Sequence, residues 1–385
     1  MFAAESEKCV LKCDRRLFDI EKQLNILRYL NPVNTRKEKE KFLRAYTEGK
    51  PYDPVFEYES CGPEVGAFCR ELKKIRGKLE YCKDSVFAPF YIKKINYLLR
   101  FRELLTHRDS PDFGGELSAF YGTPSKSLLQ EARKNLEDLK DEQVEKKLSP
   151  DDIRGVFEKE LKRLGLEWEV RPADGGGVKM AVNAACSEVH IDFSTIFSEA
   201  GIKGYLCHEI GTHVFRAENG KFQPLMLFRS GFPGYMETEE GLAAYNEARN
   251  EVLSPENLKK YSARVVAVAI CNEASFSELV DELADSFPLE EAFTFALRVK
   301  RGLSDTSLPG GYTKDYAYLS GFRKVNDFLQ KQPSEQEALK ILYCGKIGIQ
   351  HFQLVKDLLA EGILKQPRYL PEANLPSPAF SVARN

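Results

Sequence analysis

Histidine is scarce in this chain, which has only five among its 385 residues. The formal net charge of −2 is close to neutral and shows no excess of basic residues, so the composition gives no reason to expect a general nucleic-acid binder. No apolar run approaches the ~20 residues that a membrane-spanning helix needs, so no membrane partner is expected. With 30% charged and 43% hydrophobic residues, the composition is that of a globular protein and excludes collagen, coiled coil and wholesale disorder.

The first residues, MFAAESEKCVLKCDRR, lack the apolar core of a secretory signal peptide. We therefore expect a cytoplasmic protein whose nine cysteines are reduced thiols. Their odd number also excludes complete pairing in disulfides.

Helical periodicity predominates up to residue 165. A capping box of Thr35 with Glu38 is expected to begin one helix, and Ser149 followed by Pro150 to begin another. The expected helices of this region cover residues 15–30, 37–46, 62–82, 88–105, 125–143 and 150–165.

The pattern then changes to three short strands between Glu167 and Asp192, with turn chemistry at Asp174–Gly177. Helices resume at Gly201 and continue to Leu359. We predict an α+β fold that is mostly helical, with the small sheet directly before the segment 201–216. The expected divisions are an N-terminal helical subdomain at 1–165, a second domain at 166–365 and a proline-rich tail at 366–385.

Two of the five histidines, His208 and His213, fall in one short segment, HEIGTH. The common zinc-peptidase motif places its two histidines four residues apart on one helical face. A spacing of five in a regular α-helix turns the second side chain about 140° away from the first. A π-helical turn would bring both imidazoles to one ion, and Gly211 between them lowers the steric cost.

A zinc site also needs a third protein ligand. The glutamate-rich segment GYMETEEGLAAYNEARNEV (234–252) is expected to form a helix downstream. Glu240 is the preferred ligand and Glu239 the competitor, because periodicity does not separate adjacent carboxylates. Glu209 would act as the general base, which takes a proton from metal-activated water. On the residues alone, a packed or surface His–Glu pair explains the motif equally well.

Four segments in order resemble the microtubule-associated tyrosine carboxypeptidase family, whose bacterial relatives carry a QEGLA motif. The resemblance extends from about Phe18 to Leu359 and rests on CHEIGTHVFRAENG (207–220), QPL (223–225), TEEGLA (238–243) and YTKDYAYLSGF (312–322). It implies a zincin-like catalytic domain at 166–365 that binds one zinc ion per chain. Carried over residue by residue, the zinc ligands are His208, His213 and Glu240, and Glu209 is catalytic. The first letter of QEGLA is Glu239 here, which adds a second carboxylate.

The same resemblance implies a carboxypeptidase that removes a C-terminal residue, with tyrosine of the acidic α-tubulin tail as the leading substrate. The free carboxylate of such a tail needs a basic side chain. Candidates for substrate binding are Lys314, Arg216 and Arg301, with Tyr318 in the pocket; solvated surface charge explains each cation equally well.

Two further features bear on a protein or peptide tail as partner. An extended substrate is expected to add to the strand at Val182–Ala185, as in zincins. The basic runs KKIRGK (73–78) and KKINYLLRFR (93–102) offer a surface for an acidic tail on microtubules. The alternatives are a bacterial-type peptidase with another substrate, and a catalytically silent microtubule- or protein-binding module.

Overall fold

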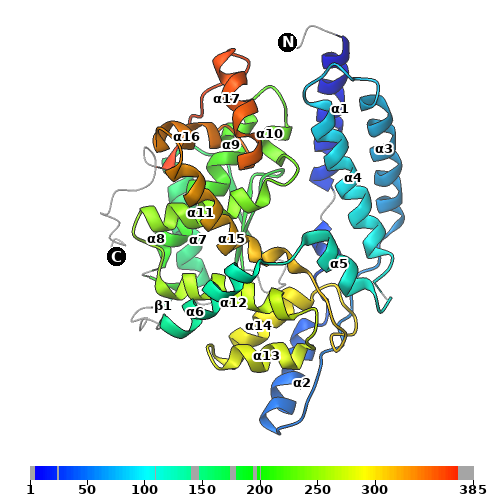
Figure 1. Cartoon of the computed structure of the whole chain (residues 1–385), viewed down its shortest axis with the longest axis vertical. Coiled ribbons are helices and arrows are strands. Elements are labelled where there is room, and N and C mark those ends of the chain that lie inside the picture. The colour runs from blue at the N-terminus through cyan, green and yellow to red at the C-terminus, as the bar shows by residue number, and fades with distance from the viewer. Residues whose placement is uncertain are drawn as a thin grey trace. The chain divides into compact units, whose positions relative to one another are not determined.

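The computed structural model of the chain describes residues 5–23, 26–108, 110–139, 147–173, 179–193, 197–199 and 201–371 (Figure 1). It divides into two compact units. Unit 1 comprises the described residues of Met1–Glu142 and Pro255–Ser320, and unit 2 comprises those of Gln143–Ala173, Lys179–Ser254 and Gly321–Asn385. This division differs from the boundary expected at residue 165, because residues 255–320 return to the N-terminal segments.

Unit 1 is built from helices, and α12 packs along α6 from far earlier in the chain. In Figure 1 the helices α1, α3 and α4 lie side by side. Its helices are α1 (Glu5–Gln23), α2 (Thr35–Thr47), α3 (Pro63–Leu79), α4 (Ala88–Leu105), α5 (Phe113–Tyr121), α6 (Lys126–Asp138), α12 (Pro255–Ile270), α13 (Phe276–Ala284) and α14 (Leu289–Lys300), with 3₁₀ turns η1 (Ile26–Tyr29) and η3 (Thr313–Tyr316).

Most helices expected in this part of the chain are confirmed within a few residues, and α4 has the expected bounds. The helix expected at 15–30 is wrong in extent, because α1 begins at Glu5 and ends at Gln23. The capping box at Thr35 is also wrong. Glu38 instead accepts hydrogen bonds from the Tyr52 hydroxyl (2.6 Å) and the Val55 amide (3.1 Å), so its buried carboxylate secures a loop. Helix α5 was not expected.

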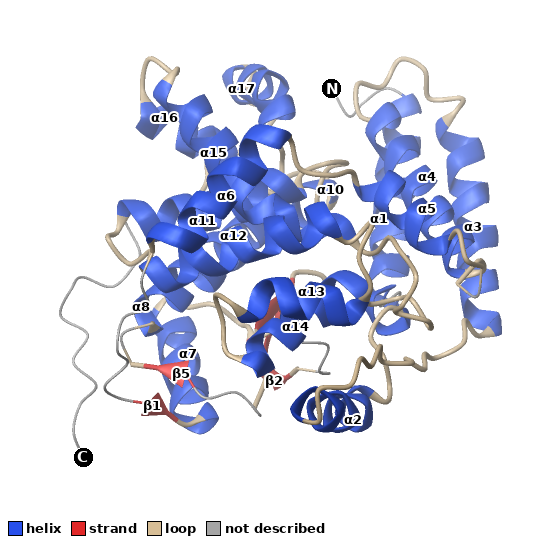
Figure 2. Cartoon of the chain, turned by 60° about the horizontal axis from the view of Figure 1, so that its bottom comes forward, coloured by secondary structure: helices blue, strands red, loops and turns tan. Residues whose placement is uncertain are grey.

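The sheet of unit 2 has the three expected strands: β2 (Glu169–Pro172), β3 (Met180–Asn183) and β4 (Glu188–Ile191). The order is β2-β4-β3, with β2 parallel and β3 antiparallel to β4, so β3 is an edge strand. Figure 2 shows how few strands there are among the helices, which confirms the α+β class. A two-residue pair, β1 (Lys147–Leu148) with β5 (Phe197–Ser198), was not expected. The expected turn at Asp174–Gly177 lies outside the described residues.

The remaining elements of unit 2 are helical. Helix α7 begins with the expected cap, in which the Ser149 hydroxyl accepts from the Asp152 amide at 3.2 Å. No helix in the described ranges is both long and apolar enough to cross a membrane. The helices are α7 (Pro150–Arg163), α8 (Ile202–Tyr205), η2 (Leu206–Val214), α9 (Phe215–Lys221), α10 (Leu227–Ser230), α11 (Met236–Arg249), α15 (Ala317–Gln330, in this unit from Gly321), α16 (Glu335–Leu342), η4 (Ile349–His351) and α17 (Phe352–Ala360).

The described part of the C-terminal tail is held by polar side chains of two motif segments. Asn219 accepts from the backbone amides of Arg368 (2.8 Å) and Tyr369 (3.0 Å) and donates to the Tyr369 carbonyl (2.8 Å). Gln223 pairs in the same two-way manner with the Lys365 backbone. The motifs NG and QPL therefore anchor residues 365–369, and the expected tail beyond residue 371 lies outside the described residues.

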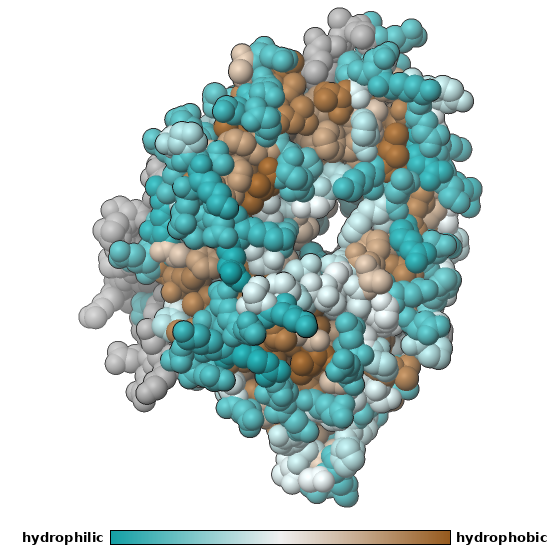
Figure 3. Space-filling view, viewed as in Figure 1, coloured by the Kyte–Doolittle hydropathy of each residue, from teal (hydrophilic) through white to brown (hydrophobic). Residues whose placement is uncertain are grey.

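Hydrophilic residues cover most of the face shown in Figure 3, with apolar patches between them.

Inside unit 2, the glycine of the EEGLA motif, Gly241, allows the backbone at Gly321 to approach α11 closely. A Cβ on Gly241 would lie 2.2 Å from the Gly321 carbonyl oxygen, and a Cβ on Gly321 would lie 2.0 Å from the Glu237 carbonyl oxygen. Both contacts are with backbone, which does not move aside as a flexible side chain can.

Gly241→Ala is therefore expected to lower the free energy of unfolding by about 1–3 kcal/mol or more, because the added methyl overpacks this contact. Gly155→Ala in α7 is the matched control: it is exposed, has open space around it, and should raise stability by about 0.5–1 kcal/mol. Urea unfolding of both variants measures the difference. Equal stability of the two would contradict the close approach of α11 to Gly321.

Candidate metal centre

The HEIGTH segment forms a π-helix, η2 (Leu206–Val214), continuous with α8 and α9. The wider turn of a π-helix brings residues five apart onto neighbouring positions of one face. The rings of His208 and His213 accordingly meet, with centroids 5.0 Å apart and planes at 75°. The π-helical turn expected from the five-residue spacing is confirmed.

Three donor atoms converge next to these rings. The Glu240 Oε2 atom lies 3.6 Å from His208 Nε2 and 3.8 Å from His213 Nε2. All three atoms fall within 4.8 Å of one another, and no other such group of His, Cys, Asp or Glu occurs in the described ranges. A tetrahedral zinc ion with bonds of about 2.0–2.1 Å holds its ligand atoms roughly 3.4 Å apart. The cluster therefore has the size of such a site.

Each histidine is oriented by a carboxylate on its other nitrogen. His208 Nδ1 lies 2.5 Å from Glu247 Oε1, and His213 Nδ1 lies 2.9 Å from Glu239 Oε1. A carboxylate that accepts a hydrogen bond from Nδ1–H fixes the ring so that Nε2 points toward Glu240, as in histidines that ligate metals. Of the two adjacent glutamates, the structure places Glu240 among the converging donors and Glu239 behind His213.

The charges of the cluster favour a cation. Burial alone would lower the pKa of His208, but hydrogen bonds to Glu240 and Glu247 outweigh it and raise that pKa well above its ordinary value. Burial likewise opposes ionisation of Glu239, yet Lys346 and Arg216 hold the pKa of this carboxyl well below its usual range. Glu239 is thus neutralised by its own partners, and Glu240 and Glu247 are left to attract positive charge at the histidines.

Glu209 is buried, with 7% of its surface exposed, and follows His208 on η2. Its Oε2 atom has no hydrogen-bond partner in the part of the chain that the structure describes. Burial raises the pKa of this carboxyl. A buried, unpaired carboxylate oxygen is costly to maintain, and an available acceptor of this kind is what a general base requires.

A polar network joins η2 to α11 and to the loop after α16. Asn246 donates to the hydroxyls of Thr212 (2.7 Å) and Tyr343 (2.6 Å), and the Tyr343 hydroxyl donates to the Gly211 carbonyl (2.8 Å). Lys346 donates to Glu239 Oε1 at 2.7 Å. These contacts fix the π-helical turn relative to Glu240.

Three further residues of the site, Glu247, Tyr343 and Lys346, were not predicted from the sequence. Glu247 had a usable signal, because it lies seven residues, or two helical turns, after Glu240 and so on the same face. Tyr343 and Lys346 had none, since they come from a segment about a hundred residues further along the chain.

Arg216, which was expected to bind substrate, lies buried among groups of the protein itself, and its role in substrate binding stays a prediction. Its side chain is 0% exposed. The guanidinium donates to Glu239, to the Leu342 carbonyl (3.2 Å) and to the Ile347 carbonyl (2.5 Å). Its donors therefore tie η2 and α9 to the C-terminal segments of unit 2 rather than to a ligand.

Arg216→Met is expected to lower the free energy of unfolding by about 3–5 kcal/mol, because it leaves Glu239 as a buried carboxylate that has lost a partner. Lys340→Met, which breaks a surface pair with Glu337, is the control and should change stability by less than about 1 kcal/mol. Urea unfolding checks both. A loss of less than about 1 kcal/mol for Arg216→Met would show that the buried pair is not structural.

The other expected substrate residues, Lys314, Arg301 and Tyr318, belong to unit 1. Arg301 is buried, with its guanidinium carbon 4.1 Å from the Tyr312 ring centre. Tyr318 stacks on Tyr261 with ring centres 5.3 Å apart, and Lys314 is half-buried in η3. Their role in substrate binding stays a prediction.

The remaining histidines have local partners, and the cysteine of the motif is buried. His107 lies 3.2 Å from Glu116, and His190 lies 3.0 Å from Glu188. His351 Nδ1 accepts from the Gly348 amide at 3.0 Å. Cys207 is buried, and burial raises its thiol pKa to about 12, so this thiol is packed rather than reactive.

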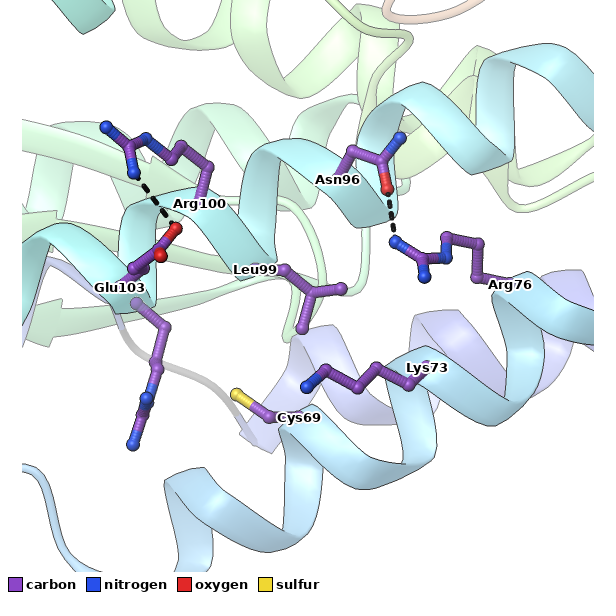
Figure 4. A pocket seen from close by; sticks show the side chains of 8 residues that line it. Cys69, Lys73, Arg76, Asn96, Leu99, Arg100 and Glu103 are labelled. Carbon is purple, nitrogen blue, oxygen red and sulfur yellow. Dashed lines mark hydrogen bonds and ion pairs between the residues drawn. The ribbon is translucent and has the colours of Figure 1, made fainter.

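The expected basic surface forms a pocket of about 350 Å³ between α3 and α4 in unit 1 (Figure 4). Arg76 of α3 donates to Asn96 of α4 across the pocket (3.1 Å), and Arg100 donates to Glu103 along α4 (3.0 Å). Four of its lining residues are basic and one is acidic: Lys73, Arg76, Arg100, Arg102 and Glu103. The two basic runs therefore meet in one surface pocket with an excess of positive charge.

Two imidazoles and a carboxylate with an adjacent free glutamate form the donor set that mononuclear zinc peptidases use. The family described as microtubule-associated tyrosine carboxypeptidase matches residues 40–381 of this chain. The match covers most of the chain, and the chain belongs to this family. The predicted family resemblance is thereby confirmed.

Individual relatives are similar over part of their length. Microtubule-associated tyrosine carboxypeptidase 1 of Rattus norvegicus is 31% identical over 174 residues, which cover 43% of this chain and 35% of the relative. The Homo sapiens protein of that name is 34% identical over 131 residues, covering 32% and 27%. MATCAP2 of Mus musculus is 28% identical over 198 residues, covering 50% and 36%. The chain thus spans about a third of the length of the curated relatives it matches.

Proposed function

We propose that this chain is a zinc-dependent carboxypeptidase that removes one C-terminal residue from a protein tail, with the terminal tyrosine of α-tubulin as its leading substrate. The observation that carries the proposal is the convergence of His208, His213 and Glu240 beside a buried Glu209. Membership of the family adds the kind of bond that is cut, since its name specifies a tyrosine carboxypeptidase.

The donor set fits zinc. Two imidazole nitrogens and one carboxylate oxygen are ligands of catalytic zinc sites, which keep a further position open. Glu247 and Glu239 provide the carboxylate–histidine pairs that commonly support such ligands. When bound, one zinc ion supplies Lewis-acid polarisation of the scissile carbonyl and of water.

The protein's own residues carry the proton and position the chain. Glu209 accepts the proton of the attacking water at its free carboxylate oxygen and passes it to the leaving amine. Its burial keeps that oxygen basic and away from bulk water. Strand β3, at the sheet edge and packed against η2, offers backbone groups to an extended substrate.

The α-tubulin tail is acidic, and the basic pocket between α3 and α4 suits such a partner. Attraction between them falls with added salt, because exposed charges are screened. We place this activity on microtubules, as the names of the family and its relatives suggest, and therefore propose the cytoplasm as its location.

The direct test is to incubate the zinc-loaded protein with purified tubulin and follow the tyrosinated tail by immunoblot. The expected result is loss of the tyrosinated signal with wild type and none with Glu209→Gln. Persistence of the signal with active, zinc-loaded protein would remove α-tubulin as the substrate.

A further inference from the structure

The turn that joins β3 to β4 is bound by an arginine from outside the sheet. Arg229, in α10, donates from Nε to the Ala184 carbonyl at 2.7 Å and from Nη2 to the Ser187 hydroxyl at 2.6 Å. These acceptors are the first and the last residue of the turn, which follows Asn183 and precedes Glu188. One planar guanidinium therefore clamps the turn at both ends.

The clamp holds a strained turn with a costly group. Ser187 has φ of 60°, a left-handed conformation that is uncommon for residues other than glycine. Arg229 is buried, with 7% of its surface exposed, and burial lowers the pKa of its guanidinium. Removal of a charge from water is unfavourable, and hydrogen bonds from a charged donor are stronger than neutral ones. The two bonds to the turn are therefore strong restraints on its position.

Helix α10 is itself fixed to the segments that support the metal donors. A Cβ on Gly220, in α9 directly after η2, would lie 2.3 Å from the Phe228 carbonyl oxygen, so the backbones of α9 and α10 are in contact. The Phe228 carbonyl also accepts from the Lys346 amide at 2.6 Å, and the Lys346 ammonium donates to Glu239. Arg229 thus ties the β3–β4 turn to the framework behind the metal centre.

Strand β3 is the part of the sheet whose position matters most for a peptide. Among the described residues, β3 pairs with β4 alone, so its other edge is available for pairing, and β3 packs against η2. A peptide that adds to an edge strand is held by main-chain hydrogen bonds. A slip of one residue would turn its side chains to the opposite face, so the edge must be fixed along its own axis.

We infer that Arg229 is a positioning residue, which fixes the β3 edge for pairing with the backbone of an extended peptide substrate. The inference rests on the proposed function for that substrate. Arg229 acts through Ala184 and Ser187 and does not itself contact the peptide. Pairing of this kind reads the main chain, so the effect of Arg229 is independent of the side chains of the tail.

The test measures binding rather than turnover, on a Glu209→Gln background of the zinc-loaded protein. The probe is a fluorescent acidic peptide ending in tyrosine, followed by fluorescence anisotropy. Arg229→Gln is expected to weaken binding roughly 10-fold, the order of one lost charged hydrogen bond. Arg229→Lys keeps the charge and one of the two bonds, so it should weaken binding by a smaller factor, and it covers the case in which Arg229→Gln does not fold.

The matched control is Arg171→Gln. Arg171 is an exposed arginine of β2 in the same sheet, where it pairs with Glu169, and its loss should leave affinity unchanged.

Two methylated peptides test whether Arg229 acts through strand pairing. Only alternate amides of an added strand face its neighbour, so one peptide is N-methylated at the odd positions and the other at the even positions. One of the two should bind the parent roughly 10-fold more weakly than the unmodified peptide does, and the other should bind normally. The weakened peptide should lose no further affinity on Arg229→Gln, because the same contacts are already lost.

Hydrogen exchange of the peptide-free protein separates positioning from general stability. Arg229→Gln should exchange faster in residues 180–191 and as the parent does elsewhere in unit 2. Faster exchange throughout unit 2 would show a merely structural role and overturn the inference. Equal affinity of the parent, Arg229→Gln and Arg229→Lys would also overturn it, as would normal binding of both methylated peptides or a parent that does not bind the unmodified peptide.

Failure of the proposed function is a different result. In that case the peptide binds in an Arg229-dependent manner, but wild type leaves it uncut.

Discussion

Glu209→Gln is expected to lower kcat roughly 10²–10⁴-fold while zinc content and folding stay unchanged. The amide keeps the size of the side chain but removes the basic oxygen, and general-base catalysis contributes a factor of this order. Single-turnover assays on a tyrosine-ended peptide measure the effect, and metal analysis of the same samples excludes zinc loss as its cause.

The control for this variant is Glu218→Gln, a buried glutamate of α9 in the same unit that accepts from the Trp168 indole at 2.9 Å. An amide oxygen still accepts that bond, so its kcat should stay within a few-fold of wild type. Full activity of Glu209→Gln would contradict the assignment of Glu209 as the base.

Glu240→Gln and Glu239→Gln are expected to differ sharply in zinc affinity. Glu240→Gln replaces a ligand carboxylate and should release the ion under mild chelation, with more than a 100-fold loss of affinity. Glu239→Gln alters the group behind His213 and should cost about 10–100-fold, as outer-shell changes do. Titration of zinc against a competing chelator measures both values.

Glu237→Gln is the control on the same helix, since Glu237 pairs with Lys324 near the surface, and it should bind zinc as wild type does. The reverse order, with Glu239→Gln releasing zinc and Glu240→Gln retaining it, would exchange the two roles. Equal affinities for all three variants would remove the α11 carboxylates from the site.

The sequence predicted those features that depend on residues close together in the chain. The five-residue spacing of His208 and His213 indicated that a π-helical turn would bring the two imidazoles together, and the structure has such a turn at η2. Short segments of alternating or β-branched residues predicted the three strands. The Ser149 cap predicted the start of α7. Each of these depends on neighbours within a few residues.

The rest depends on packing between distant segments, which periodicity does not encode. Glu239 and Glu240 are adjacent on α11, and only the position of Arg216 and Lys346 beside Glu239 separates their roles. The division into two units likewise follows from α12 packing on α6. Arg216 was expected to hold substrate because its charge was visible in the sequence while its burial was not.

Mass spectrometry of a defined peptide ending in tyrosine, after incubation with the zinc-loaded protein, tests the proposed activity directly. We expect a product shorter by the single C-terminal tyrosine with wild type, and intact peptide with Glu209→Gln or after zinc removal. Internal cleavage, or equal loss of tyrosine with Glu209→Gln, would contradict a zinc carboxypeptidase built on His208, His213, Glu240 and Glu209.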